Sequence, residues 1–453
     1  MNLILKQINT GYKLLLLNII FLVCSSLLTA QTAVSNFGER EKKEIITKAL
    51  ELIKENFVFP ERYYQIEKVI KEKITDEGYD TVNTREEFLG KLNHDLQTAG
   101  RDRHLRISYS PQLVNQINED RKNEGSSSPT FTPELLNWLQ FENYGLRKVE
   151  RLEGNIGYFK FDRFIDLVIA KKSITGAMNF IRNSSAIILD LTDNGGGSSV
   201  TSELIVNYFL PDGQKIGDVK FRNNPLTKES VVIHDSSVSK IPEGVPVYIL
   251  VSNKTASAAE AVSYVLQQFK RAKVIGEQTS GKANPGELFV VNDSLYMMVP
   301  TGSFAVLPTG TNWEGTGVTP DFVIDPILAL PKAITEVCSL LEKSDENGEH
   351  KILYSWIKDQ YLAQLNPEFP SQKFIDRITG NYENGRRIVY ENGIVYYVGN
   401  TGVKRKLTYL NNHTFMIEGR NDYRLQFPSD REPVEYYTVL WYDGTSEKVG
   451  KIN

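Results

Sequence analysis

Two stretches decide the predicted fold: residues 186–198, AIILDLTDNGGGS, and residues 246–260, PVYILVSNKTASAAE. Each begins with a short, almost wholly apolar and β-branched run, which is the composition of a strand buried on both faces. Each then passes through a short connection into a helical pattern, at 198–210 and 257–269. Because alternating strands and helices build a largely parallel sheet, the sequence predicts an α/β core.

The region before this core has a different pattern. From residue 38 to about 110, apolar residues recur mostly at helical spacing, and Thr84 with Glu87 fits a capping box. A polar, Gly/Ser-rich loop follows at 121–130. We therefore expect an N-terminal helical domain over 38–110.

The core itself is expected over residues 145–330, with residues 287–307 as strands of a hairpin or meander. A helical stretch follows at 331–362. Beyond it, Asn-Gly and Asp-Gly pairs recur between alternating aromatic segments, a strong hairpin signal. The sequence thus predicts a small antiparallel β domain at about 373–453.

Composition excludes several classes of protein. The chain has 453 residues, 41% hydrophobic and 24% charged, with a net charge of -4 and no long basic run, which argues against a nucleic-acid binder. Two cysteines, Cys24 and Cys338, are too few for a disulfide framework or a zinc site. Zinc-protease, P-loop and lipase-type motifs are also missing from the sequence. No metal or nucleotide cofactor is predicted.

The N-terminus predicts export. Lys6 and Lys13 precede an apolar run at 14–23, and small residues follow it, as in a secretory signal peptide. Residues 1–30 are the predicted signal, with cleavage near Ala30, and the mature protein is expected in the periplasm or outside the cell. The alternative is a retained membrane anchor, but about 20 apolar residues are needed to span a bilayer. Stable membrane insertion after cleavage is not expected.

Two segments at the ends of predicted strands contain candidate catalytic groups. The glycines of residues 194–198 let the backbone approach a ligand and present N–H groups to a developing oxyanion. An ordinary strand–helix turn is the alternative. Ser257 begins a helix, where a nucleophile would be exposed at a sheet end. It also fits a capping box with Glu260, so a purely structural role stays open.

Two glycine-bounded loops carry charged residues beside strands. Residues 276–286 contain Lys282, and residues 312–318 contain Glu314. Such loops often hold functional residues. Solvated side chains on plain surface turns are the alternative.

Together with Asp102-Arg103-His104-Leu105, the order of these motifs resembles peptidase family S41. This family includes the C-terminal processing proteases, the tricorn-core proteases and the interphotoreceptor retinoid-binding protein modules. The resemblance covers about residues 38–330. It implies a crotonase-like α/β core with an associated helical domain, and a serine peptidase acting on peptide or protein substrates. Residues 111–154 are too few for the PDZ domain of the processing branch, so the chain resembles a branch without it.

The resemblance implies a Ser257 nucleophile with one of two bases. In the processing proteases a lysine serves, and Lys282 matches it; in the tricorn-like branch a histidine and a glutamate serve, and His104 and Glu314 match them. The motif around His104 and the missing PDZ domain favour the histidine, with Lys282 as the alternative. The backbone amides expected to hold the oxyanion are those of Gly196, Gly197 and Ala258.

Two functions outside catalysis remain as alternatives. Retinoid-binding relatives have the same fold and carry hydrophobic ligands, so a non-catalytic binding module is one. An inactive scaffold whose β domain binds cell-envelope partners is the other. The natural substrate, the cleavage preference and the oligomeric state do not follow from the sequence.

Overall fold

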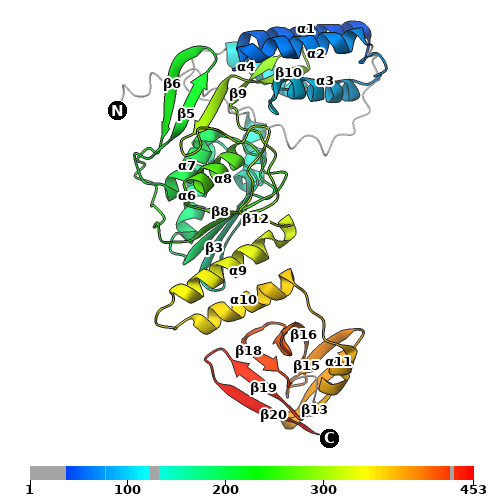
Figure 1. The fold of residues 1–453 in the computed structure, drawn as a ribbon, viewed down its shortest axis with the longest axis vertical. Coiled ribbons are helices and arrows are strands. Elements are labelled where there is room, and N and C mark those ends of the chain that lie inside the picture. Colours follow the sequence, from blue (N-terminus) through cyan, green and yellow to red (C-terminus); the bar gives the residue numbers. More distant parts are fainter. Residues whose placement is uncertain (1–36, 77, 123–131, 429–432, 453) are drawn as a thin grey trace. The chain divides into compact units, whose positions relative to one another are not determined.

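The computed structural model describes residues 37–76, 78–122, 132–428 and 433–452 (Figure 1). The predicted signal at 1–30 and most of the predicted loop at 121–130 lie outside the described residues. The described chain divides into two units. Unit 1 holds the residues up to Arg151 together with Gly157–Val323, and unit 2 holds Leu152–Ile156 together with the residues from Ile324 onward.

Unit 1 is built on a six-stranded sheet with the strand order β12-β8-β7-β4-β3-β2. Strands β4, β7, β8 and β12 run parallel to one another, as the sequence predicts. All residues of β4 and β7 are buried, which accounts for their almost wholly apolar sequences. The strands are β2 (Leu146–Leu152), β3 (Ile156–Phe161), β4 (Ala186–Asp190), β7 (Val247–Val251), β8 (Lys273–Gly276) and β12 (Phe322–Val323).

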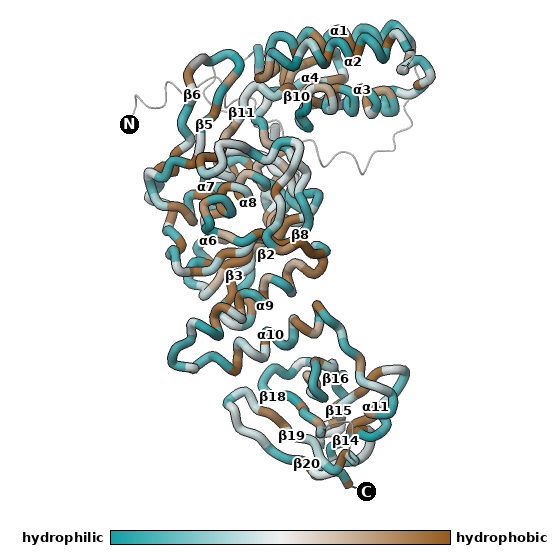
Figure 2. The backbone as a smooth tube through the Cα atoms, in the orientation of Figure 1, coloured by the Kyte–Doolittle hydropathy of each residue, from teal (hydrophilic) through white to brown (hydrophobic). Residues whose placement is uncertain are grey.

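Three helices accompany this sheet: α6 (Leu167–Ile181), α7 (Ser199–Phe209) and α8 (Ala258–Gln268). Their apolar residues share one core cluster with those of the strands. Hydrophobic residues accordingly gather along the sheet in Figure 2, brown in its colour scale. Helices α7 and α8 directly follow β4 and β7, so the two motif-bearing connections lie at the same edge of the sheet.

The N-terminal part of unit 1 is mostly helical. Its helices are α1 (Glu39–Asn56), α2 (Tyr63–Thr75), α3 (Arg85–Gly100), α4 (Pro111–Lys122) and α5 (Pro133–Phe141), with 3₁₀ turns at Pro60–Arg62 and Asn143–Gly145. Thr84 caps α3 as predicted, its hydroxyl accepting a hydrogen bond from the Glu87 amide at 3.3 Å.

This helical part also contains a strand that the sequence analysis did not predict. β1 (Arg106–Tyr109) pairs with β10 (Leu295–Pro300), which pairs with β9 (Gly286–Val290). Helices α1–α3 lie beside this small sheet (Figure 1), and their core includes Leu295 and Met297. A four-residue strand forms here because a distant hairpin supplies its hydrogen-bond partner.

A second three-stranded sheet has the order β11-β5-β6. It consists of β5 (Lys215–Phe221), β6 (Asn224–Val231) and β11 (Gly302–Val306). The predicted strands at 287–307 are thus confirmed, but β11 leaves the β9–β10 hairpin and pairs with β5 instead. Gly302 makes this passage, where an added Cβ would lie 2.9 Å from Pro285 Cγ.

Unit 2 begins with α9 (Pro326–Ser344), α10 (Lys351–Leu365) and α11 (Gln372–Ile378). The predicted antiparallel domain is a closed barrel of eight strands, which pairing of β13 with β20 completes. Its interior is filled by aromatic residues such as Phe374, Phe415 and Tyr437. The barrel strands are β13 (Gly380–Tyr382), β14 (Arg386–Glu391), β15 (Ile394–Val398), β16 (Lys404–Asn411), β17 (Thr414–Ile417), β18 (Arg420–Gln426), β19 (Tyr436–Trp441) and β20 (Ser446–Ile452), with a 3₁₀ turn at Glu383–Gly385.

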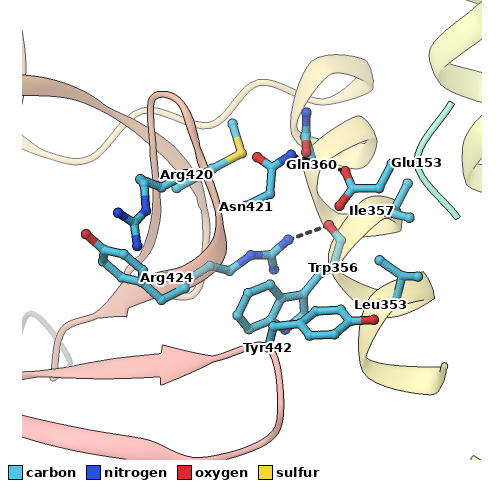
Figure 3. A pocket seen from close by; sticks show the side chains of 11 residues that line it. Glu153, Leu353, Trp356, Ile357, Gln360, Arg420, Asn421, Arg424 and Tyr442 are labelled. Atoms are coloured by element: carbon cyan, nitrogen blue, oxygen red, sulfur yellow. Dashed lines mark hydrogen bonds between the residues drawn. The ribbon is translucent and has the colours of Figure 1, made fainter. Parts of the chain in front are cut away.

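A buried arginine joins the barrel to α10 within unit 2 (Figure 3). The Arg424 guanidinium pairs with Asp359 at 3.0 Å, lies 4.5 Å from the Trp356 ring and donates to the Trp356 carbonyl. The neighbouring pocket, about 20 Å³, has room for little more than one water molecule. These contacts have a structural role.

No helix in the described ranges is long and apolar enough to cross a membrane.

Candidate active site

Ser257 has a strained backbone at the turn from β7 into α8. Its φ of 55° and ψ of −117° lie in a region that non-glycine residues rarely occupy. Such a conformation costs about 1–3 kcal/mol and persists only where the surroundings enforce it. The amide of Ser257 donates to Glu260 Oε2 at 2.8 Å, which is half of the predicted capping box. The cap and an exposed nucleophile are therefore compatible at one residue.

The predicted glycine motif lies directly against this serine. At Gly196, whose φ is +94°, an added Cβ would lie 2.6 Å from the Ala256 carbonyl oxygen and 2.8 Å from Ser257 Cβ. Real side chains do not tolerate such distances, so the chain requires glycine here.

The three predicted oxyanion donors differ in availability. The Gly196 amide already donates to Asn194 Oδ1 at 2.9 Å, so it is engaged within the protein. Ala258 is the first residue of α8, and its amide has no intrahelical partner. Among the described residues the amides of Gly197 and Ala258 form no hydrogen bond. Of the three predicted donors, the amides of Gly197 and Ala258 are therefore the ones left without a partner in the described part of the chain.

Glu260 is a residue whose wider role the sequence analysis missed. Its fully buried carboxylate accepts from the amides of Ser257 and Lys282 at Oε2, and from Gly281 N and the Thr279 hydroxyl at Oε1. Burial raises the pKa of Glu260, and these hydrogen bonds oppose that rise. The S-x-x-E spacing predicted the cap, but the contacts with the 279–282 loop depend on tertiary structure.

His104 follows α3 and lies beside two carboxylates. Asp102 Oδ1 accepts from the His104 amide at 2.9 Å, and Asp102 Oδ2 accepts from Asn284 Nδ2 at 2.8 Å. A ring nitrogen of His104 and carboxylate oxygens of Asp102 and Glu314 all lie within 4.8 Å of one another. The structure thus brings together His104 and Glu314, which lie far apart in the sequence.

Glu314 is fixed by backbone amides. Its Oε1 accepts from Arg103 N at 2.8 Å, and its Oε2 accepts from Ala283 N at 2.6 Å and from Asn284 N at 3.2 Å. Three such ligands could in principle hold a metal ion. All four carboxylate oxygens of Asp102 and Glu314, however, already accept N–H groups of the protein. The donor set therefore fits a hydrogen-bonded cluster better than a metal centre.

Burial and one neighbouring charge keep the His104 imidazole neutral. Burial and the positive charge of Lys282 lower the pKa of His104 to about 3. His104 Nδ1 is buried and has no partner among the described residues. Burial and the charge of Arg106 lower the pKa of Lys282, while Glu260 and Glu314 act in the opposite direction. Burial and the charge of Glu314 raise the pKa of Asp102.

A cavity of about 1150 Å³ opens at this place. Six of the seven predicted site residues line it, namely Ser257, His104, Lys282, Gly196, Gly197 and Ala258. Glu314 does not line the cavity and contacts the site through the Asp102–His104 cluster. A neutral imidazole and a lysine of lowered pKa therefore line the same cavity as the half-buried Ser257, and either could accept the proton of a serine.

Comparison with known families gives two matches along the chain. Residues 155–324 match peptidase family S41. Residues 27–139 match the N-terminal domain of Peptidase S41 in eukaryotic IRBP. The boundaries of the first match enclose Ser257, Lys282 and Glu314, and those of the second enclose His104.

The chain is also similar in sequence to curated processing peptidases. The chain is 30% identical over 207 residues to carboxyl-terminal-processing peptidase 1 of Arabidopsis thaliana chloroplasts, and 28% identical over 180 residues to a carboxy-terminal-processing protease of Bartonella bacilliformis. These matches cover 45% and 39% of this chain, and 40% of each relative, so the chain spans well under half of their length.

Solved structures show weaker likeness. A lipoprotein from Streptococcus agalactiae matches with a TM-score of 0.43 and 18% identity, covering 69% of this chain and 100% of that one. The tricorn protease matches with a TM-score of 0.41 and 14% identity, covering 67% of this chain and 37% of that one.

Proposed function

The chain belongs to peptidase family S41 through residues 155–324, and on that premise we propose that it is an exported serine peptidase with Ser257 as its nucleophile. The observation that carries the proposal is the strained backbone of Ser257 at the N-terminus of α8, beside a cavity that His104 and Lys282 also line. A serine that served only as a helix cap would not need this backbone strain. The core is proposed to be crotonase-like, as the family resemblance implies.

In the proposed reaction the Ser257 hydroxyl attacks a substrate peptide carbonyl and forms a tetrahedral oxyanion. The amides of Gly197 and Ala258 stabilise this charge, because both are available beside the serine. The leaving amine takes the proton that the base received from Ser257. Water then hydrolyses the acyl-enzyme and regenerates the free hydroxyl.

His104 is the proposed base. It is held neutral, so it can accept a proton, and Glu314 lies close enough to stabilise the imidazolium that forms. Burial is the main cause of the low pKa of His104, and the nearby charge of Lys282 adds to it. Lys282 is the alternative base, since burial lowers its pKa and Glu260 joins its backbone to that of Ser257.

Labelling tests the proposal directly. A fluorophosphonate should modify the protein at Ser257, located by mass spectrometry of the digest, and Ser257→Ala should abolish both labelling and peptide cleavage. Ser263→Ala is the matched control, because its hydroxyl bonds only to the Ala259 carbonyl on the same helix. An unlabelled protein without peptidase activity, at a concentration where a known serine peptidase reacts, would favour the binding-module alternative.

Export is proposed from the sequence of residues 1–30 alone. Expression of the full chain should give a mature N-terminus near Gln31 in the periplasmic or extracellular fraction. N-terminal sequencing that finds an intact Met1 on the located protein would contradict cleavage.

A further inference from the structure

One face of strand β1 forms part of the cavity wall. His104, Arg106 and Ser108 line the cavity, while the intervening Leu105 and Ile107 are buried in the helical core. This alternation is the period of an extended chain. Arg106 is therefore two residues from the proposed base and projects to the same side.

The strand partner of Arg106 gives the cavity wall a small apolar contact. Arg106 lies opposite Met298 on β10, and Met298 lies opposite Leu288 on β9. All three residues line the cavity. Leu288, like Tyr296 on β10, is at most 4% exposed because it packs with residues of α4, whereas Met298 is half-buried. Arg106 therefore stands beside one apolar side chain that a ligand can contact.

Carboxylates in the cavity wall are matched to cations other than Arg106. Asp162 pairs with Arg147, Asp193 with Lys160 and Lys254, and Glu229 with Lys215; the nearest cations acting on Glu203 and Glu287 are Lys228 and Arg121. Among the described residues, no carboxylate oxygen lies within 4.0 Å of the Arg106 side chain.

The surroundings leave this charge available to a ligand. Arg106 is exposed to the cavity, and its charge acts on Tyr296 and on Lys282, which is itself a basic residue. Two like charges at one wall attract an anion more strongly than either alone. Arg103, another arginine of the cavity wall, donates to the Ser280 carbonyl.

Resting on the proposed peptidase function, we propose that Arg106 binds a carboxylate of the substrate while an adjacent apolar side chain packs on Met298. The guanidinium offers the planar pair of N–H groups that a carboxylate accepts. Its partner is either the C-terminal α-carboxylate of a peptide or the side chain of Asp or Glu next to an apolar residue. Arg106 is thus a specificity-determining residue.

Matched peptides distinguish these sources. One internally quenched apolar hexapeptide is prepared in four forms. Two forms have the same apolar sequence and end either in a free carboxylate or in an amide. The other two end in an amide and have Glu or Gln as the last residue. The acid form, or the Glu form, should be cleaved at least tenfold more efficiently than its neutral counterpart, mainly through KM; tenfold is about 1.4 kcal/mol. Arg106→Gln should reduce that ratio to about one, and Arg106→Lys should retain part of it.

Arg222→Gln is the control, because this exposed arginine on the β5–β6 turn does not line the cavity. It should leave the ratio unchanged. The proposal is overturned if the wild-type protein cleaves acid and neutral peptides equally, or if Arg106→Gln keeps the preference.

Binding to Ser257→Ala separates this proposal from the proposed function. Fluorescence anisotropy should show the same preference for the acid or Glu peptide, lost in the Ser257→Ala/Arg106→Gln double variant, with thermal unfolding confirming that both are folded. Binding that depends on Arg106 without cleavage by the wild-type protein would contradict peptidase function and support the carboxylate site. Cleavage without any charge preference would do the reverse.

Discussion

The backbone amides of Ser257 and Lys282 donate to the same oxygen, Glu260 Oε2, at 2.8 and 2.9 Å. One buried carboxylate thereby joins the start of α8 to the loop that carries the lysine. Ser257 and the two proposed bases, His104 and Lys282, all line one cavity.

Removing the proposed base should nearly abolish turnover. His104→Ala should reduce kcat almost as far as Ser257→Ala, and the double variant should be little worse, because members of one catalytic unit are non-additive. Lys282→Met should lower kcat roughly tenfold, which corresponds to about 1.4 kcal/mol of transition-state stabilisation. Steady-state kinetics on one quenched peptide measures all four. An active His104→Ala beside a dead Lys282→Met would assign the base to the lysine.

The pH profile should respond to the charge of Lys282. Activity requires neutral His104, so it is present above the pKa of His104 and lost as the pH falls through it. Burial and Lys282 hold that pKa near 3, far below the ordinary 6.5, so the acid limb of kcat/KM should lie well below pH 6. Lys282→Met should move the limb to higher pH, and Lys282→Arg, which keeps the charge, should not. An acid limb that stays in place in Lys282→Met is the contrary result.

Glu260→Gln should impair both stability and activity. The amide would place an NH₂ group against backbone N–H donors in a site without water access, and a buried donor left unsatisfied costs about 1–3 kcal/mol. Chemical denaturation should report that loss, and kcat should fall because the position of Ser257 is relaxed. Glu243→Gln, at an exposed residue, is the control and should change neither. A fully stable and active Glu260→Gln would mean that the shared contact is dispensable.

Gly196→Ala should inactivate the protein. The new methyl group would lie 2.6 Å from the Ala256 carbonyl oxygen at a positive φ, so the glycine loop or Ser257 must shift. A displacement of about 1 Å at the nucleophile can cost about a hundredfold in rate. Fluorophosphonate labelling and kcat measure the effect. Gly244→Ala is the matched control, since nothing lies within 4 Å of its added Cβ, and equal activity of the two variants would refute the steric argument.

Arg424→Ala should destabilise unit 2 without changing the active-site chemistry. It removes the ion pair with Asp359 and the stacking on Trp356. We expect the free energy of unfolding to fall by about 2 kcal/mol. Breaking a fully buried pair costs about 3–5 kcal/mol, and the cost is smaller here because the Asp359 side chain is 30% exposed. Thermal unfolding should show the loss, and Arg387→Ala, at an exposed barrel residue, should not. An unchanged unfolding temperature in Arg424→Ala would show that the ion pair contributes little to stability.

The sequence by itself determined the elements whose patterns are local. Short, almost wholly apolar runs rich in β-branched residues indicated β4 and β7 as buried strands, Thr84 indicated the start of α3, and Asn-Gly pairs such as Asn392-Gly393 indicated the hairpin turns of the barrel. Each of these features depends on residues within a few positions of one another. Local propensity and side-chain periodicity are therefore sufficient to predict them.

Only the tertiary structure decided what depends on distant partners. β1 exists because β10 pairs with it, β13 closes the barrel because it pairs with β20, and Glu260 joins Ser257 to Lys282 because two loops meet at its carboxylate. The engagement of the Gly196 amide by Asn194 Oδ1 and the low pKa of His104 have the same origin. Hydrogen bonds and charges act over a few ångströms in space, and no spacing along the chain specifies which groups the fold will bring within that distance.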